Sequence, residues 1–442
     1  MTPDAAGPDA AARQDADLAV ARAFRAEWGR LVALVIRLTG DWDLAEECAQ
    51  DAFVQAAATW PRDGVPRRPG AWLVTVARNR ARDRLRRRTV ETARWEAAAA
   101  DLPGHEPVAG ADAAALADDE EVTMADAVPD DRLLLMFTCC HPALALDARV
   151  ALTLRTLAGL TTAELARAFL VSPASMAQRL VRAKRKIRHA GIPYRIPPAH
   201  LMPERTAGVL AVLYLLFNEG YAASAGPELI RRSLADEAIR LGRVLVDLMP
   251  DEPEARGLLA LMLLHDARRD ARTDDAGDLV TLEHQDRSRW DAARIAEGVT
   301  LLEGVPAARR AAPYQLQAAV AACHATAPVA ADTDWHRIAD LYGTLTGVAP
   351  SPVVELNRAV AVAMAEGPDA GLALVEALAA SGALPGYHLL PATRADLLRR
   401  AGRPAEAALA YAEALALAPG DVERRYLRRR LDEARGSGET RE

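Results

Sequence analysis

Two short segments of this chain carry cationic side chains spaced closely enough to bind a nucleic-acid backbone. Residues 179–188 contain six Lys or Arg and no acid, and residues 78–88 contain seven Arg and one Asp. Each segment has a net charge of +6, whereas the whole chain has a formal charge of −7. Because guanidinium and ammonium groups bind phosphates, two cationic segments in an acidic chain predict two separate contacts with nucleic acid.

A predicted helix-turn-helix over residues 160–188 positions the second of these segments. Thr161 can cap the first helix, with Glu164 completing a capping box, and Ser172 can cap the second helix ahead of Pro173. One face of the second helix carries the apolar residues Met176, Leu180, Ala183 and Ile187. The opposite, cationic face is suited to the major groove of duplex DNA.

Three further predicted helices position the first cationic segment. The first covers about 17–39, the second follows Asp41 and stops at Pro61, and the third covers about 69–88. On the third helix Arg78, Arg82 and Arg86 recur every four residues, so they share one face and can meet successive phosphates or bases. Asn79 lies beside this row, where its amide can hydrogen-bond a base edge.

The sequence predicts an all-α protein with a linker and a large C-terminal domain. The predicted segments are a disordered tail at 1–17, helical domains at 18–90 and 130–192, an acidic linker at 91–129 and a helical-repeat domain at 200–435. Residues 96–131 contain eleven acids and no Lys or Arg, which indicates a self-repelling tether. A tetratricopeptide-like (TPR-like) helix pair is indicated by Ala395, Leu398, Gly402, Ala407, Tyr411, Ala414 and Pro419.

Other site chemistries find little support in this sequence. Cys139, Cys140 and His141 are adjacent, so their side chains point in different directions on a helix and are expected in the core rather than on a metal ion. No phosphate-binding glycine loop, hydrolase elbow or zinc-protease motif occurs. We therefore expect no cofactor, no metal and no enzymatic activity. The longest apolar run has 11 residues, so a cytoplasmic location is expected.

The first 190 residues resemble an RNA polymerase sigma factor of the extracytoplasmic-function type. The matching segments are Asp43–Phe53, Ala71–Asn79 with Asp83–Arg87, and the helix-turn-helix, in the family's order. The C-terminal half resembles the extension of sigma factors that carry a TPR-like domain, most strongly at Leu213–Tyr221. The implied partners are promoter DNA and core polymerase, through its β′ clamp helices and β flap.

The resemblance also implies a role for each set of residues. The polymerase-binding residues would be Asp43, Glu46, Glu47, Gln50 and Asp51. The residues that recognise and open the −10 element would be Arg67, Arg68, Arg78, Asn79, Arg82 and Arg86. The residues that read the −35 element would be Ser172, Ala174, Ser175, Gln178, Val181, Arg182 and Arg185. The family more often has Gly-Thr-Val-Arg at 174–177, where this chain has Ala-Ser-Met-Ala, so its −35 preference is expected to differ.

Two other interpretations remain open. The chain could be an operator-binding regulator with a TPR-like sensor, although the cationic helix at 78–88 and the segment at 43–53 argue against this. A catalytic or small-molecule site in the C-terminal half would centre on Asp286, Arg287, Trp290 and Asp291. These four residues are also explained by a helix start and an ion pair. Trp72 could stack on a base, but a core position is favoured.

Overall fold

The computed structural model describes residues 8–100, 131–169, 171–221, 228–274, 278–305, 312–418 and 420–439. The chain forms two compact units, residues 1–212 and 213–442, and each is described here by itself. The described residues are mainly α-helical, with one isolated β-bridge between Thr273 and Leu279. The all-α prediction is therefore confirmed. No described helix is long and apolar enough to cross a membrane.

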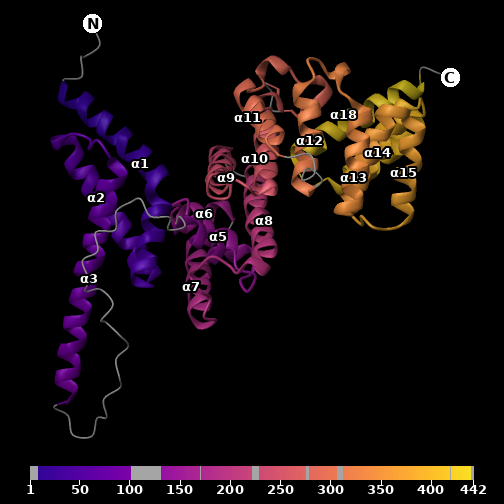
Figure 1. Ribbon diagram of the computed structural model, residues 1–442. Helices are drawn as coiled ribbons and strands as arrows, with labels where there is room; N and C mark the ends of the chain where they lie inside the picture. Colours follow the sequence, from indigo (N-terminus) through magenta and orange to yellow (C-terminus); the bar gives the residue numbers. More distant parts are fainter. Residues whose placement is uncertain are drawn as a thin grey trace. The chain divides into compact units, whose positions relative to one another are not determined.

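The first unit contains three long helices and a group of shorter ones (Figure 1). Their bounds are α1 Pro8–Thr39, α2 Trp42–Asp63, α3 Pro69–Ala100, α4 Asp131–Cys139, α5 Leu146–Thr156, α6 Thr162–Ala168, α7 Pro173–His189, and the start of α8 Met202–Tyr221. The segment expected to be a tail is helical from Pro8 onward. Most of the predicted acidic linker, residues 101–130, lies outside the described residues, and its first ten residues belong to α3.

Aromatic packing joins α1, α2 and α3 into one helical domain. Trp28 of α1 is almost fully buried and packs against Phe24 and Phe53, at ring-centroid distances of 5.0 and 6.3 Å. The Asp41 side chain accepts hydrogen bonds from the backbone N–H groups of residues 43 and 44, as a helix cap does. Pro61 does not stop α2, which continues to Asp63 because the break falls at Gly64, where φ is +81°.

The helix-turn-helix forms as the sequence predicts. Thr161 and Glu164 make a complete capping box at the start of α6, and Ser172 caps α7 through the backbone N–H of Ser175 at 3.2 Å. The predicted apolar stripe of α7 is buried over its whole length, at Met176, Leu180, Ala183 and Ile187. Because this stripe is buried, the opposite face of α7 faces solvent.

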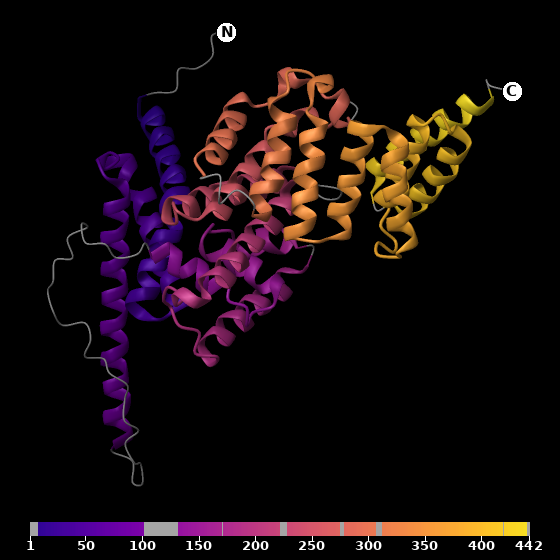
Figure 2. The same cartoon turned by 45° about the vertical axis from the view of Figure 1, so that its right-hand side comes forward.

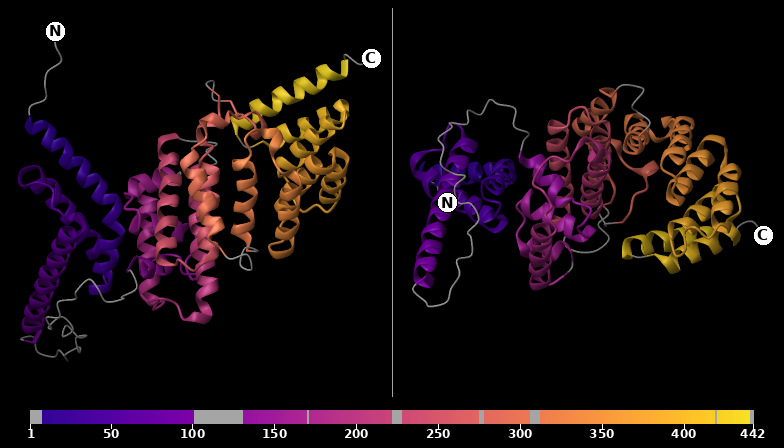
Figure 3. Two further views of the ribbon diagram at one scale, coloured as in Figure 1. Left: turned by 45° about the horizontal axis from the view of Figure 1, so that its top comes forward. Right: turned by 60° about the horizontal axis from the view of Figure 1, so that its bottom comes forward.

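The second unit is a succession of helices that run alternately in opposite directions (Figures 2 and 3). Its elements are the end of α8, α9 Glu228–Leu248, α10 Pro253–Asp266, α11 Ala292–Glu303, α12 Pro313–Thr326, α13 Trp335–Val348, α14 Pro352–Glu366, α15 Pro368–Ala380, α16 Leu389–Arg400, α17 Pro404–Leu417 and α18 Asp421–Glu439. Short 3₁₀ turns at Arg269–Ala271, Leu282–His284 and Arg287–Arg289 connect α10 to α11.

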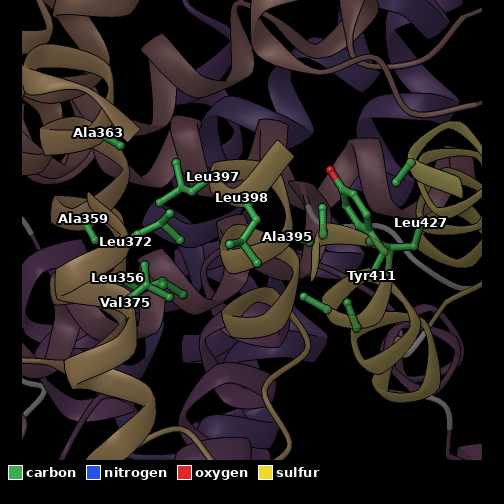
Figure 4. Packing of buried hydrophobic residues seen from close by; sticks show 14 of the residues in the cluster. Leu356, Ala359, Ala363, Leu372, Val375, Ala395, Leu397, Leu398, Tyr411 and Leu427 are labelled. Atoms are coloured by element: carbon green, nitrogen blue, oxygen red, sulfur yellow. The ribbon is translucent and has the colours of Figure 1, made fainter. Parts of the chain in front are cut away.

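The helix pair predicted near the C-terminal end is present as α16 and α17. Ala395, Leu398 and Tyr411 are buried in one apolar cluster with residues of α14, α15 and α18 (Figure 4). Gly402 joins the two helices at a φ of +74°, a left-handed conformation that favours glycine. The small residues Ala407 and Ala414 are fully buried, which lets the helices pack closely.

Candidate polymerase and nucleic-acid interface

The arginines of α3 form two rows with different surroundings. In the first row, Arg84 forms ion pairs with Glu47 and Asp51 of α2, and Arg88 with Asp41 at 2.7 Å. Arg80, one turn earlier, lies 3.4 Å from the side chain of Gln55. This row therefore holds α3 against α2.

The second row, Arg78, Arg82 and Arg86, forms no ion pair within the described part of the chain. Arg82, Arg86 and the neighbouring Asn79 are exposed. Arg78 is half-buried, and its Nε is a buried donor with no protein partner. The arginine row that the sequence predicts to bind DNA is therefore the row whose charges no carboxylate neutralises among the described residues.

The loop before α3 also faces solvent. Arg67 and Arg68 lie between the end of α2 and the start of α3, and both are exposed. Trp72 is half-buried and packs edge-to-face on Trp60, with ring centroids 5.7 Å apart. The Trp72 side chain therefore contributes to packing, and the sequence analysis favoured such a core position.

The five predicted polymerase-binding residues of α2 differ in accessibility. Asp43, Glu47 and Gln50 are exposed, and Asp51 is half-buried beside Arg84. Glu46 is buried, with about 7% of its surface accessible. It faces the helix-turn-helix domain rather than solvent.

A buried ion-pair cluster joins α2 to the helix-turn-helix domain within the first unit. Lys184 Nζ of α7 donates to Glu46 Oε1 at 2.7 Å and to Asp43 Oδ1 at 2.8 Å. Arg155 of α5 donates to the other oxygen of Glu46, Oε2, at 2.9 Å. Lys184 adds to the net charge of residues 179–188, but it is buried and so does not belong to the cationic outer face.

The packing around this cluster is close. The backbone of α1 approaches the helix-turn-helix domain at Gly29, where a Cβ would lie 2.8 Å from the carbonyl oxygen of Leu157. Trp28 Nε1 lies 3.4 Å from the carbonyl oxygen of Arg155, and the Tyr194 hydroxyl lies 3.0 Å from that of Ala33. The two helical domains of the first unit therefore share a specific contact surface.

The outer face of α7 is accessible along its whole length. All seven predicted −35 residues are exposed: Ser172, Ala174, Ser175, Gln178, Val181, Arg182 and Arg185. Arg179 is not part of this face, because it pairs with Asp147 at 3.6 Å and lies over the ring of Phe169. The face thus combines cations with small and polar groups, as a base-reading helix does.

Cys139 and Cys140 are buried in the core, as predicted. Cys139 Sγ lies 3.2 Å from Thr156 Oγ1, and Cys140 Sγ lies 3.6 Å from Thr153 Oγ1. His141 turns away and accepts a hydrogen bond from the backbone N–H of Ala143. Among the described residues, no group of three or more His, Cys, Asp or Glu side chains could hold a metal ion.

Burial predicts that these thiols react slowly. Desolvation raises the pKa of Cys140 to about 11 and raises that of Cys139 further, and it raises the pKa of Cys48 to about 11. Because the thiolate is the nucleophile, we expect a thiol reagent at pH 8 to label Cys323 first, since it is the half-buried one. The other three should react only after denaturation. Equal labelling rates for all four in the native protein would contradict this expectation.

Comparison with known proteins agrees with the two helical domains of the first unit. Residues 23–90 match Sigma-70 region 2, and residues 134–187 match Sigma-70, region 4. Residues 205–305 match a family of unknown function. No solved structure matches the chain.

A relative matches over almost the full length. An uncharacterised protein of Rhizobium meliloti (strain 1021) is 44% identical over 421 residues, which cover 94% of this chain and 95% of the relative. The match spans both units, so the two proteins share one domain organisation. The chain therefore belongs to the family of this Rhizobium protein, and its region 2 and region 4 domains make it a sigma factor of the extracytoplasmic-function type, which binds core RNA polymerase and promoter DNA.

Proposed function

We propose that α3 recognises and opens the −10 element through Arg78, Arg82 and Arg86, with Asn79 beside them and Arg67 and Arg68 in the preceding loop. The observation that carries this proposal is the division of α3 into two arginine rows. One row is neutralised by α2, and the other is left without carboxylate partners in the described residues. The phosphates of single-stranded DNA would supply the missing anions, and its bases would supply hydrogen-bond acceptors.

The −35 element is assigned to the outer face of α7. Its exposed residues, from Ser172 to Arg185, lie opposite the buried stripe, so the helix can enter a major groove without disturbing the core. Arg182 and Arg185 would contact phosphates or guanine edges, and Gln178 would contact adenine.

The polymerase clamp helices are assigned to the acidic face of α2. Asp43, Glu47, Gln50 and Asp51 support this assignment, since each is at least partly accessible. Glu46 would join them only after Lys184 and Arg155 have moved away. Polymerase binding and the contact between the two domains therefore compete for the same carboxylates.

The second unit is assigned a regulatory role as a TPR-like domain. Its helices α14 to α18 pack as successive antiparallel pairs around one apolar cluster, and such arrays present extended binding surfaces. No catalytic role is assigned to Asp286 and Asp291. Asp286 caps the 3₁₀ turn at 287–289 and Asp291 caps α11, so both side chains have structural uses.

Run-off transcription with purified core polymerase tests the proposed function. The full chain should give a promoter-dependent product that core polymerase alone does not give. A chain that ends at Tyr221 retains α8, whose first half belongs to the first unit. A changed product yield from this shorter chain would support regulation by the second unit, and an unchanged yield would contradict it. Duplex binding without any transcription product would instead favour an operator-binding regulator.

The salt dependence of duplex binding gives a prediction for α7. Arg185→Ala should weaken binding of the chain to a −35 duplex and reduce the slope of log K against log salt concentration by about 1, because one phosphate contact is lost. Fluorescence anisotropy at several salt concentrations measures this slope. Arg195→Ala, which removes an exposed arginine beyond the end of α7, should leave the slope unchanged. Equal slopes for both variants would show that Arg185 does not contact the DNA.

A further inference from the structure

The second unit contains three arginines that lie near one another and have no carboxylate partner among the described residues. Arg268 Nη2 lies 3.0 Å from His265 Nδ1 and 3.5 Å from the Tyr221 hydroxyl. Arg272 donates to the carbonyl oxygen of Tyr221 at 2.7 Å, and its guanidinium lies 4.0 Å from the centre of the Tyr221 ring. Arg287 donates to the backbone carbonyl oxygens of residues 324 and 327, both at 2.6 Å.

The two segments that carry these cations lie side by side, since the backbone N–H of Asp291 donates to the carbonyl oxygen of Ala267 at 2.9 Å. Burial together with the charge of Arg272 lowers the pKa of Arg268, and burial together with the charge of Arg268 lowers that of Arg287. Burial and neighbouring arginines also lower the pKa of His265 to about 3 and that of His324 to about 4, so both imidazoles are neutral at pH 7. We call Arg268, Arg272 and Arg287 the arginine cluster.

Arg287, one member of this cluster, lines a pocket of about 610 Å³. Its walls include Arg287, His324, Trp335, Val360, Met364 and Arg400. Trp335 packs edge-to-face on His324, with ring centroids 5.1 Å apart, so one wall is rigid and aromatic. Apolar side chains of α14 also line the pocket. Such a mixture of apolar walls and a few polar groups is typical of small-molecule sites.

Of the charged groups that line the pocket, Arg400 is paired with carboxylates and Arg287 is not. Its two carboxylates, Glu283 and Asp396, both form ion pairs with Arg400 at 2.8 Å. Arg287 has no such partner. The carboxylate that acts on its charge, Asp332, is exposed and forms no ion pair with it. The lining at Arg287 is therefore positive, and the charge of Arg268 adds to its potential.

We propose that this pocket binds a small organic anion, whose phosphate or carboxylate group lies at Arg287 and whose apolar body lies against Trp335 and Met364. A guanidinium offers paired N–H donors that match either oxyanion. Three half-buried cations near one another repel, and an anion removes this repulsion. The Nε1 of Trp290, whose ring lies under Arg287, is also a buried donor without a partner.

Thermal unfolding of the full chain with small probes tests the proposal. Phenyl phosphate and benzoate supply the two oxyanions on an aromatic body. Benzyl alcohol supplies the body alone, and sodium chloride at equal ionic strength supplies charge alone. We expect a saturable rise in melting temperature with at least one of the two anions and none with the controls, because a ligand stabilises the state that binds it. A rise with only one of them identifies the oxyanion. No rise above that in sodium chloride with either would overturn the proposal.

Matched variants locate the site. Arg287→Ala should weaken the binding of the active probe about ten-fold or more, whereas Arg289→Ala, on the same 3₁₀ turn and exposed, should leave it unchanged. Isothermal titration calorimetry measures both affinities. Equal affinities for the two variants would place the anion elsewhere and overturn the proposal.

A second substitution separates anion binding from a purely structural role. Arg268→Gln retains donors toward Tyr221 and His265 but removes one charge from the cluster. It should maintain or raise the melting temperature without anion, and it should reduce the rise caused by the probe. A lower melting temperature with an unchanged rise would show that the arginines only stabilise the fold. These measurements need no polymerase; only an effect of the anion on transcription rests on the regulatory role proposed above, so the two proposals fail separately.

Discussion

The double substitution Arg78→Ala and Arg82→Ala is expected to abolish open-complex formation while preserving binding to core polymerase. Both side chains belong to the unneutralised row of α3, and neither contacts the acidic face of α2 among the described residues. Each base or phosphate contact of this kind contributes about 1–3 kcal/mol, so the loss of two should reduce promoter opening at least ~30-fold.

Permanganate reactivity of unpaired thymines measures promoter opening, and a polymerase pull-down measures binding to core enzyme. Arg87→Ala is the matched control, because it removes an exposed arginine from another face of the same helix turn. The control should open the promoter at the wild-type rate. Equal losses of opening and of polymerase binding in the double variant would mean that this row supports the fold or the polymerase contact rather than DNA.

Glu46→Gln is expected to destabilise the first unit strongly, because it leaves the half-buried Arg155 without a carboxylate and the buried Lys184 with only the exposed Asp43. Removal of one partner from a buried ion pair costs about 3–5 kcal/mol. For a unit of this size, we expect the melting temperature to fall by roughly 6 °C or more. Differential scanning calorimetry of the full chain measures the transition.

Asp43→Asn is the matched control for this prediction. Asp43 binds the same Nζ of Lys184, but its side chain is 66% exposed, so its loss should cost no more than about 1 kcal/mol. A fall of similar size in both variants would show that burial of Glu46 does not determine the stability of the contact. Unchanged melting temperatures in both would show that the contact between the two domains contributes no stability.

Features that depend on neighbouring residues were predictable from the sequence. The caps of α6 and α7 and the stripe from Met176 to Ile187 follow from side chains within one or two turns. The helix pair around Gly402 follows in the same way, since its small residues alternate with large ones at helical spacing. The start of α1 and the end of α3 were not predicted, because alanine and arginine favour a helix but do not mark where it begins or ends.

Features that join distant residues were not predictable. Lys184 lies four residues after Leu180, so it shares the arc of the apolar stripe, and this position was the available sign that it faces inward. Its partner Glu46 is 138 residues away, and no local pattern specifies that pairing. The arginine cluster likewise depends on the 3₁₀ turns that bring Arg268 and Arg287 together, although the sequence did single out Arg287.

The contact between Lys184 and Glu46 has a kinetic consequence for initiation. Elements at −10 and −35 are about 25 base pairs apart, which is roughly 85 Å along B-form DNA. On the proposed assignment, a recognition helix joined to α2 by the ion pair between Lys184 and Glu46 has to leave α2 before α7 and α3 can bind both elements. On the proposed assignment, we expect capture of both elements to include a separation of the two domains whose rate is independent of DNA concentration, and this step would limit how often the factor can start a transcript.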